Sequence, residues 1–314
     1  MSQGPSQRRE VVARNVEPRL TAIVVHHHTP ELLNACIESL CAGSRVPDQI
    51  VVVDNEVPAG DPAPSWQAPV PVRVLAQSGN PGYAASCNLG AAAATGDVLL
   101  FLNADVAVSP GSVERCMAAL EDPGVGIVTC RLQRPDGTLD HASHRGIPTP
   151  LASAAYLLRL DRIRPRSRRL GRYRLSWLDP ATDHDIEACS GAFLMIRRSM
   201  LAQAGGWDER YWFYGEDLDL CVRIREAGYH VRYLGSTWAT HVKGASSHLR
   251  EPDRLLGSEE RLVKRRVQRA ILESHQLFFR QHLAPHASLP ERAAARMLFA
   301  VQRMRLHVAS GSKA

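Results

Sequence analysis

Two groups of acidic and amide side chains stand out because of where they lie relative to apolar segments. Asn103 and Asp105 directly follow the apolar run 98–102, which is typical of a buried strand. Glu216 and Asp217 come much later, at the expected start of a helix. An unpaired carboxylate is costly inside a core, so we expect both groups to face a cleft. One carboxylate can hold a metal ion and another can accept a proton. That chemistry is needed to transfer a group away from a diphosphate.

The spacing of Asn103 and Asp105 places two oxygen donors on one side of an extended segment. Oxygen ligands suit hard cations such as Mg²⁺ and Mn²⁺, which also bridge diphosphates. The alternative is that Asp105 caps the following turn. His241 is a candidate nitrogen ligand, although a lone histidine is more often structural. The sequence therefore predicts a Mg²⁺ or Mn²⁺ site around Asp105.

Glu216 and Asp217 are the candidates for acid–base chemistry. The dipole at a helix N-terminus stabilises negative charge, so we expect low pKa values for both carboxyl groups. Helix capping is the alternative role and is expected of one of the two. Asp219 is expected to pair with Arg223, which lies one turn further along the helix.

Two further segments follow predicted strands and are candidates for ligand binding. Asp54 can accept hydrogen bonds from a base or a ribose, next to Asn55, whereas a turn or a helix cap is the alternative. The glycine-rich turn 79–83, with Gly82 and Tyr83, would let the backbone pass close to a ligand. A simple turn is the alternative, because the segment matches neither a Walker loop nor a dinucleotide fingerprint.

Strands alternate with helices in the first half of the chain. Strands are predicted at 21–25, 49–53, 72–75, 98–102 and 126–128, and helices at 30–42, 83–95 and 110–120. Such alternation indicates βαβ units and a mainly parallel sheet. Right-handed crossovers would bring the strand ends, with Asp54, the glycine-rich turn and Asp105, to one edge of the sheet.

The second half is less regular. Strands are predicted at 192–196 and 231–234, helices at 197–204 and 216–227, and two amphipathic helices from residue 258 onwards. Residues 58–71 are expected to form a surface loop. The arginine-rich segment 159–174 is expected to be mobile.

Composition and charge narrow the class of protein. The chain has 314 residues and a net charge of +6, and no apolar run reaches the length of a membrane span. Residues 159–174 hold eight Arg against one Asp, and residues 250–314 hold thirteen Lys or Arg against six Asp or Glu. These regions favour a phospholipid surface or a lipid diphosphate as partner, with solvated helix faces as the alternative. No nucleic-acid module is recognisable, which argues against nucleic acid.

The cysteines and the N-terminal segment indicate the compartment. The seven cysteines form no CxxC pair and lie mostly in apolar or helical stretches. Reduced, buried thiols in the cytoplasm are therefore expected. Residues 1–19 are polar, lack the apolar stretch of a signal peptide, and are expected to form a loose tail.

Together these motifs resemble family 2 glycosyltransferases with the GT-A fold, above all bacterial rhamnosyltransferases that act on lipid-linked acceptors. The resemblance runs from about residue 21 to about residue 247 and is specific as an ordered set. The matching pieces are TPELL at 29–33, VVVDN at 51–55, NPGYAASCNLG at 80–90, LNAD at 102–105, SGAFLMIRR at 190–198, GGWDERY at 205–211, EDLDL at 216–220, and His241.

The resemblance implies roles for the matched residues. Asp105 would be the metal-binding Asp of the DxD motif, with Asn103 in the first acidic place, and His241 would be a further metal ligand. Asp217 would be the catalytic base, beside Glu216. The nucleotide and donor sugar would contact Asp54, Asn55, Gly82, Tyr83, Asn88, Asn103, Ala104 and Gly191. The acceptor side would be formed by Trp207, Asp208 and Tyr211.

The chain also departs from the family pattern. Asn103 removes one negative charge from the DxD motif, and residues 26–28 are three consecutive histidines where the family often has a segment like Asn-Tyr-Asn. The usual Ser-x-Asp-Gly-Ser pattern is missing after Asn55. A catalytically inactive binding module therefore remains an alternative. A sugar-1-phosphate nucleotidyltransferase is another, although it would need a glycine-rich basic loop in place of residues 26–30.

The resemblance implies an inverting, metal-dependent glycosyltransferase of cell-envelope polysaccharide synthesis. Its donor would be a nucleotide-diphosphate sugar, first of all dTDP-L-rhamnose, and its acceptor a glycan or a polyprenyl-diphosphate-linked glycan. The expected domains are a tail at 1–19, a GT-A domain at 20–250 with a mainly parallel sheet flanked by helices, and a basic helical extension at 251–314. The basic segments would contact the inner face of the cell membrane. The sequence leaves open a homo-oligomer.

Overall fold

The computed structural model describes residues 17–55, 68–242 and 256–311, and the statements below concern these residues. Most of the expected tail at 1–19 and of the expected loop at 58–71 lies outside the described residues. The expected domain boundary at residue 250 also lies outside them.

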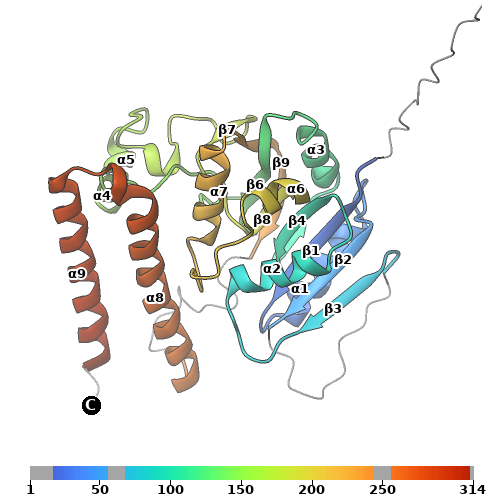
Figure 1. The fold of residues 1–314 in the computed structure, drawn as a ribbon, viewed down its shortest axis with the longest axis horizontal. Coiled ribbons are helices and arrows are strands. Elements are labelled where there is room, and N and C mark those ends of the chain that lie inside the picture. Colours follow the sequence, from blue (N-terminus) through green and yellow to red (C-terminus); the bar gives the residue numbers. More distant parts are fainter. Residues whose placement is uncertain (1–16, 56–67, 243–255, 312–314) are drawn as a thin grey trace, which may run out of the picture.

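A nine-stranded mixed sheet forms the centre of the molecule (Figure 1). Its first half is parallel, in the order β3-β2-β1-β4, and its second half continues with β8-β6-β9-β5. The strands of the first half are β1 (Leu20–His26), β2 (Gln49–Asp54), β3 (Val72–Ala76) and β4 (Val98–Asn103). The strands of the second half are β5 (Val106–Val108), β6 (Val125–Gln133), β8 (Phe193–Arg197) and β9 (His230–His241).

The prediction of a mainly parallel sheet therefore holds for the first half only. β8 pairs antiparallel with both β4 and β6, β5 pairs antiparallel with β9, and β7 (His184–Ile186) also pairs antiparallel with β9. β6 and β9 are parallel. The mixed half arises because its strands are not joined by the regular helical crossovers that keep the first half parallel.

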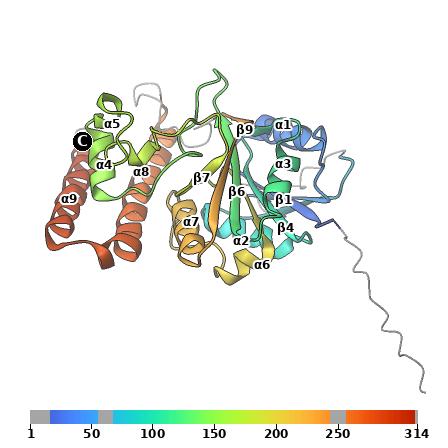
Figure 2. The same cartoon turned by 90° about the horizontal axis from the view of Figure 1, so that it is seen from above.

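Helices cover both faces of the sheet, as Figure 2 shows. α1 (Pro30–Cys41) and α3 (Ser112–Ala119) pack on one face. α2 (Tyr83–Ala93), α6 (Arg198–Gln203) and α7 (Glu216–Glu226) pack on the other. Because both faces are covered, the central strands are continuously apolar rather than alternating. This explains why the apolar runs were recognisable as strands in the sequence.

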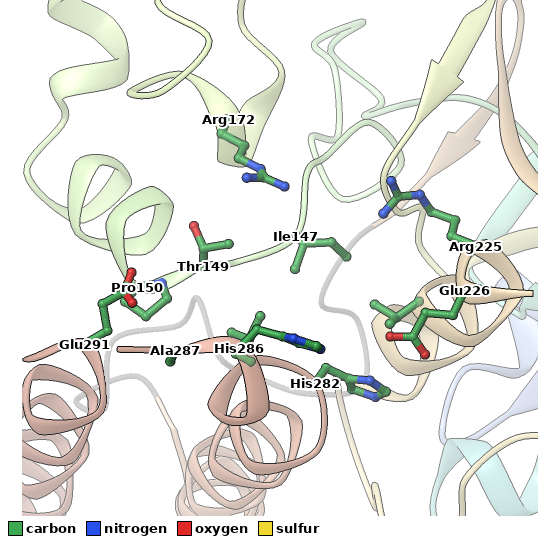
Figure 3. Close-up of a pocket in the computed structure, with 12 residues that line it drawn as sticks. Ile147, Thr149, Pro150, Arg172, Arg225, Glu226, His282, His286, Ala287 and Glu291 are labelled. Carbon is green, nitrogen blue, oxygen red and sulfur yellow. The ribbon is translucent and has the colours of Figure 1, made fainter. Parts of the chain in front are cut away.

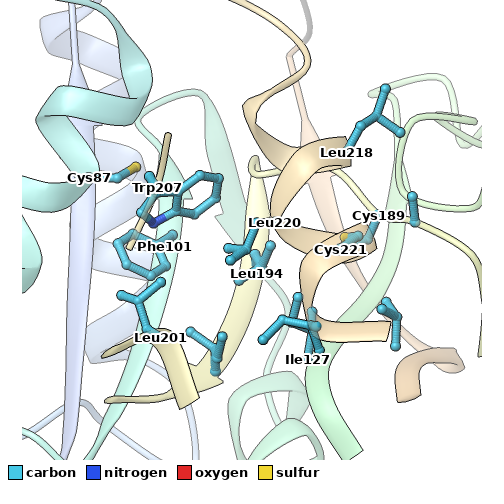
Figure 4. Close-up of a cluster of buried hydrophobic side chains, with 14 of the residues drawn as sticks. Cys87, Phe101, Ile127, Cys189, Leu194, Leu201, Trp207, Leu218, Leu220 and Cys221 are labelled. Atoms are coloured by element: carbon cyan, nitrogen blue, oxygen red, sulfur yellow. The ribbon is translucent and has the colours of Figure 1, made fainter. Parts of the chain in front are cut away.

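The core on the α2 side is built around Trp207. Its ring lies edge-on to Phe101, with 5.1 Å between ring centroids, and edge-on to Tyr83, with a distance of 5.8 Å. Figure 4 shows Trp207 beside Cys87 and Phe101, with Leu194 and Leu220 further along the same layer. This core holds the start of α2 and the ends of the central strands in place.

Most predicted elements are confirmed, but three short elements outside residues 159–174 were not predicted. These are β5, β7 and α4 (Pro150–Leu157). β6 and β9 are also longer than expected. Three-residue strands carry too little periodicity to be recognised, and their pairing partners lie far away in the sequence.

The expectation that residues 159–174 are mobile is wrong. The segment folds as α5 (Leu160–Ile163), a series of turns, and the 3₁₀ turn η1 (Arg172–Arg174). The buried carboxylate of Asp161 lies 3.4 Å from a guanidinium nitrogen of Arg174, which also stacks on Tyr156 at 4.9 Å. A buried acid that needs its cationic partner therefore fixes the fold of this basic segment.

The C-terminal helices pack against the sheet domain. They are α8 (Ser258–Phe278), the short helical turns η3 (Phe279–Leu283) and η4 (Ala284–His286), and α9 (Leu289–Gly311). Phe278 joins the hydrophobic core, and Nε2 of His282 lies 2.7 Å from a carboxylate oxygen of Asp219 in α7. Asp219 also forms the expected pair with Arg223, at 2.6 Å. Among the helices of the described ranges, none is long and apolar enough to cross a membrane.

Gly90 is required where α2 crosses β1 and β2. A Cβ at this position would overlap Cγ2 of Ile23 and lie 3.2 Å from Cγ2 of Val53. Gly90→Ala should gain helix propensity of about 1 kcal/mol but lose more to overpacking, which costs roughly 1–3 kcal/mol. We expect a lower free energy of unfolding in urea. Gly43→Ala is the control, because its Cβ would meet backbone at 3.6 Å, an ordinary contact. Equal stability of the two variants would contradict this packing.

Candidate active site

A cleft of about 270 Å³ opens at the carboxyl ends of β1, β2 and β4. The first half of α8 also lines this cleft, through Val263, Arg266 and Val267. The predicted site residues that line this cleft are Asn55, Tyr83, Asn103, Ala104, Asp105, Gly191, Glu216, Asp217 and His241. Both acidic groups that were singled out in the sequence therefore meet in one cleft.

Pairing of β5 with β9 brings His241 to Asp105. The antiparallel register places Val106 opposite His241, and the backbone N–H of Val242 donates to the carbonyl of Asp105 at 2.9 Å. Nε2 of His241 consequently lies 3.3 Å from Oδ1 of Asp105. The two predicted metal ligands, which are 136 positions apart by their numbers, become neighbours through this unpredicted short strand.

Asp140 is a site residue that sequence reasoning missed. Its Oδ2 lies 3.0 Å from Nδ1 of His241, so the imidazole is held between two carboxylates. Burial acts to lower the pKa of His241, but the neighbouring carboxylates of Asp105 and Asp140 outweigh it and raise the pKa to about 9. Asp140 lies in a turn after β6 and carries no local signal that would have indicated this role.

The donor set around Asp105 fits a divalent cation. Oδ1 of Asp105 is buried and accepts no well-formed hydrogen bond, which leaves its lone pairs available. A carboxylate, an imidazole and the nearby amide of Asn103 are oxygen and nitrogen ligands of the type that Mn²⁺ accepts. Within the described ranges, no group of three or more His, Cys, Asp or Glu forms a complete metal site. Further ligands would have to come from a bound substrate or water, as is usual for Mg²⁺ with phosphates.

Asp217 is fixed by a buried ion pair with Arg145. Oδ2 of Asp217 lies 2.7 Å from a guanidinium nitrogen of Arg145 and accepts the backbone N–H of Gly191 at 3.2 Å. Oδ1 accepts the N–H of Leu218 at 2.7 Å. A carboxylate has about four lone-pair directions, so one direction on Oδ1 remains for an incoming hydroxyl.

Arg145 was not predicted, and its neighbours in the sequence give no indication of its role. It is 7% exposed and lies in the segment between β6 and α4. Burial acts to lower the pKa of Arg145, but the Asp217 carboxylate outweighs it and raises the pKa further above the ordinary value. Arg145 is therefore a permanent cation beside Asp217.

Glu216 differs sharply from its neighbour. Burial, followed by the charge of Asp217, raises the pKa of Glu216 to about 8. Its Oε2 is buried and has no hydrogen-bond partner within the described residues. The expectation of a low pKa is wrong for Glu216, because desolvation outweighs the helix dipole at this position. The Glu216 carboxyl group therefore holds a proton to higher pH than an ordinary glutamate does.

The donor-side residues are only partly in the cleft. Tyr83 donates to the carbonyl of Gly191 at 2.6 Å, and Asn55 accepts from Ser86 at 2.9 Å. Asp54 is 5% exposed, lies 3.2 Å from Nδ1 of His26, and does not line the cleft.

Gly82 lies behind the cleft lining. Its φ is 105°, and a Cβ there would lie 2.5 Å from the carbonyl oxygen of Trp212. Gly82 thus allows the close approach of Trp212, which itself lines the cleft.

Asn88 and the residues predicted for the acceptor side lie outside the cleft lining. The Asn88 amide donates to the carbonyl of Trp207 at 2.9 Å, and Tyr211 donates to Gln281 at 2.7 Å. Asp208 pairs with Arg210 at 2.6 Å, and this hydrogen bond lowers the pKa of Asp208 to about 2. These contacts give the residues structural roles in the turn 205–211.

Aromatic residues just before the acidic pair line the cleft, although they were not predicted as site residues. They are Trp212, Phe213 and Tyr214. The guanidinium of Arg266 from α8 stacks on Trp212, 4.3 Å from the ring centroid. The position of this aromatic run next to the acidic pair could have indicated its place in the cleft. Nothing in the sequence indicated that α8 would line the cleft. Residues 26–28, the three histidines, also line the cleft.

A second cavity of about 400 Å³ lies between the C-terminal end of α7, α4 and the turns η3 and η4 (Figure 3). None of the predicted site residues lines it. Two of its cationic side chains are already paired, Arg172 with Glu187 at 2.8 Å and His282 with Asp219 at 2.7 Å. The cleft at the strand ends is therefore the candidate active site.

Comparison with known proteins identifies the family to which the chain belongs. The profile described as glycosyl transferase family 2 matches residues 21–204, and a profile described as the N-terminal domain of galactosyltransferase matches residues 177–244. The chain is 30% identical over 240 residues to the N-acetylglucosaminyl-diphospho-decaprenol L-rhamnosyltransferase of Mycobacterium tuberculosis, with 73% of this chain and 77% of the relative covered. It is 28% identical to the O-antigen biosynthesis protein RfbC of Myxococcus xanthus over 73% of this chain and 18% of the relative.

Solved structures share the fold. GalNAc-T7 with UDP, GalNAc and Mn²⁺ has a TM-score of 0.56 at 15% identity, over 90% of this chain and 55% of the neighbour. The mannosyltransferase PcManGT from Pyrobaculum calidifontis, with GDP-Man and Mn²⁺, has a TM-score of 0.50 at 16% identity, over 93% and 84% of the two chains. The profile match over more than half of the chain, the relative at 30% identity and this fold show that the chain belongs to glycosyltransferase family 2 and is a glycosyltransferase with a GT-A fold.

Proposed function

We propose that the enzyme transfers L-rhamnose from dTDP-L-rhamnose to a hydroxyl of a polyprenyl-diphosphate-linked glycan, with inversion at the anomeric carbon. The observation that carries the proposal is the meeting of Asp105, His241 and Asp217 in one cleft. The choice of sugar and acceptor is supported by the relative of 30% identity, which is named for rhamnose transfer to a decaprenol-linked acceptor. Cell-envelope polysaccharide synthesis is the matching process.

Asp217 is the catalytic base of this proposal. The acceptor hydroxyl donates to the free direction of Oδ1 and its proton passes to that oxygen while the hydroxyl oxygen attacks the anomeric carbon. The bond from that carbon to the diphosphate breaks, and the diphosphate leaves on the opposite face. Arg145 and the N–H of Gly191 hold the other carboxylate oxygen, so the base keeps one orientation. A single displacement needs only one such carboxylate.

Glu216 has a complementary role. Because its pKa is raised, Glu216 can hold a proton and donate a hydrogen bond in the cleft while Asp217 accepts one. Two adjacent carboxyl groups in different environments can therefore perform different tasks, which is a common arrangement in active sites. Trp212, Phe213 and Tyr214 would pack against the acceptor sugar through their apolar faces.

Asp105, His241 and the amide of Asn103 would hold a divalent cation, Mg²⁺ or Mn²⁺. When bound, such a cation offsets the negative charge on the leaving diphosphate. Asp140 is then a positioning residue, because its contact with Nδ1 turns Nε2 of His241 toward Asp105. Asn103 supplies an oxygen without charge, so the site depends more on Asp105 than a site with two carboxylates would.

Sugar transfer is favoured over the two alternatives. Family membership supports a glycosyltransferase rather than a sugar-1-phosphate nucleotidyltransferase. An inactive binding module would not need the buried pairing of Asp217 with Arg145, which costs desolvation energy.

The first test is a panel of nucleotide sugars with and without Mn²⁺ or Mg²⁺. Melting temperature and release of the nucleotide are both measured. The true donor should raise the melting temperature, since a ligand at 100 times its Kd stabilises the native state by about 2.7 kcal/mol. We expect dTDP-L-rhamnose to give the largest metal-dependent shift. Absence of both shift and turnover with every donor would favour the inactive module instead.

Asp217→Asn should reduce transfer by roughly 10²- to 10⁴-fold, the usual contribution of a general base, while donor binding persists. Glu216→Gln is the matched control, because it makes the same chemical change at the adjacent position. Its amide can still donate a hydrogen bond, so we expect transfer within about tenfold of the unmodified enzyme. The reverse pattern would assign the base to Glu216. Loss of donor binding in Asp217→Asn would also count against the base role.

Asp140→Asn should lower the pKa of His241 from about 9 in the metal-free protein, because one of the two carboxylates that stabilise the imidazolium is removed. The stability that His241 gains by being protonated is present below its ordinary pKa of 6.5 and is lost as the pH rises through 9. The melting temperature of the variant should therefore vary less between those two values. NMR titration of the imidazole measures the shift directly.

The same variant should require roughly 10- to 100-fold more metal for transfer, the usual cost of losing a partner of a metal-binding histidine. Asp185→Asn is the control, because Asp185 lies 3.3 Å from the exposed His230 instead. An unchanged His241 titration in Asp140→Asn would refute the positioning role.

A further inference from the structure

An exposed apolar surface with no role in the cleft or the core lies around α5. Four large apolar side chains of α4, α5 and the residues between them are exposed to solvent: Leu151 by 56%, Leu157 by 60%, Leu158 by 68% and Ile163 by 72%. Figures 1 and 2 both place α4 and α5 at the end of the molecule opposite α1 and α3. Neither the catalytic roles nor the packing of the core requires these side chains to be exposed.

The same segment is strongly basic. Six exposed arginines lie among or just after the apolar side chains: Arg159, Arg162, Arg164, Arg166, Arg168 and Arg169. Within the described part of the chain, none of their guanidinium groups forms an ion pair or a side-chain hydrogen bond. The one acid of the segment, Asp161, is buried and faces Arg174. Residues 157–169 thus combine exposed apolar groups with six exposed arginines and have a net charge of +5.

The exposed apolar side chains belong to a segment that is folded and anchored to the rest of the molecule. Thr149 accepts the N–H of Ala152 at 3.3 Å and so caps α4. Tyr156 packs on Tyr173, with 4.6 Å between ring centroids. The guanidinium of Arg174 lies over the ring of Tyr156. The inner side of the segment is therefore anchored, and the backbone holds Leu157, Leu158 and Ile163 outward.

We propose that residues 157–169, which we call the basic docking surface, bind an anionic lipid bilayer. Apolar side chains between arginines match the boundary between acyl chains and negatively charged head groups. Charge complementarity selects this partner over a second copy of the chain, because two surfaces of net charge +5 would repel each other.

A nucleic acid is a poorer match for the basic docking surface. Single strands are bound by stacking of bases on exposed aromatic rings. The aromatic residues nearest to the surface, Tyr156 and Tyr173, are packed on one another instead. Exposed leucine and isoleucine side chains gain nothing from a phosphate backbone, whereas a bilayer buries them.

The test is sedimentation of the full chain with vesicles, without any sugar donor. It is therefore independent of the proposed reaction. Vesicles of phosphatidylglycerol mixed with phosphatidylcholine are compared with vesicles of phosphatidylcholine alone, at low and high salt. We expect binding to the anionic vesicles only, weakened by salt because the attraction between the arginines and the head groups is screened.

Two pairs of matched variants locate the surface. Arg162→Glu with Arg164→Glu should lower the partition coefficient by roughly 25-fold or more, whereas the same charge change at Arg265 and Arg269 of α8 should have a much smaller effect. Leu157→Ser with Leu158→Ser should lower it by about tenfold. Met297→Ser with Met304→Ser is the apolar control, because these α9 residues are 69% and 61% exposed. Circular dichroism checks that each variant is folded.

Three outcomes would overturn the proposal. The first is failure of the unmodified protein to bind anionic vesicles. The second is equal or greater loss of binding in the α8 and α9 variants, which would move the contact to those helices. The third is unchanged vesicle binding in Arg162→Glu with Arg164→Glu while binding of a single-stranded oligonucleotide is lost, which would assign the surface to nucleic acid.

Discussion

The buried ion pair between Arg145 and Asp217 is the interaction on which the site depends. It joins the segment after β6 to the first turn of α7, and the N–H of Gly191 ties the start of β8 to the same carboxylate. Three separate parts of the chain therefore converge on one group. Removal of one partner from a buried pair typically costs 3–5 kcal/mol, so the geometry of the Asp217 carboxylate and the stability of the fold cannot be separated.

That pair also shapes the behaviour of the neighbouring carboxyl group. Asp217 has a cation and two N–H groups beside it, whereas Glu216 has a buried oxygen without a partner within the described residues. Burial and the charge of Asp217 together raise the pKa of Glu216 to about 8. Adjacent positions at one helix N-terminus thus experience different electrostatic environments, because local desolvation and specific partners outweigh the helix dipole.

The second half of the sheet brings the partners of Asp105 into place. The short strand β5 pairs with the end of β9 and carries His241 to the end of β4, and Asp140 holds the far side of the imidazole. In the same cleft, α8 brings Arg266 onto Trp212. The parallel half of the sheet therefore supplies the strand ends at the cleft. The mixed half of the sheet and the helix α8 complete the cleft around them.

The sequence by itself determined the parallel half of the sheet and the placement of Asp105 and Asp217, because those features follow from apolar runs and from what directly succeeds them. It also indicated the basic segment 159–174, but not that the segment is folded. Only the tertiary structure decided that Asp140 and Arg145 belong to the site, that Asn88 and Tyr211 do not line the cleft, and that Trp212 to Tyr214 do. These outcomes depend on strand register and on contacts between distant segments, and neither leaves a periodic signal in the local sequence.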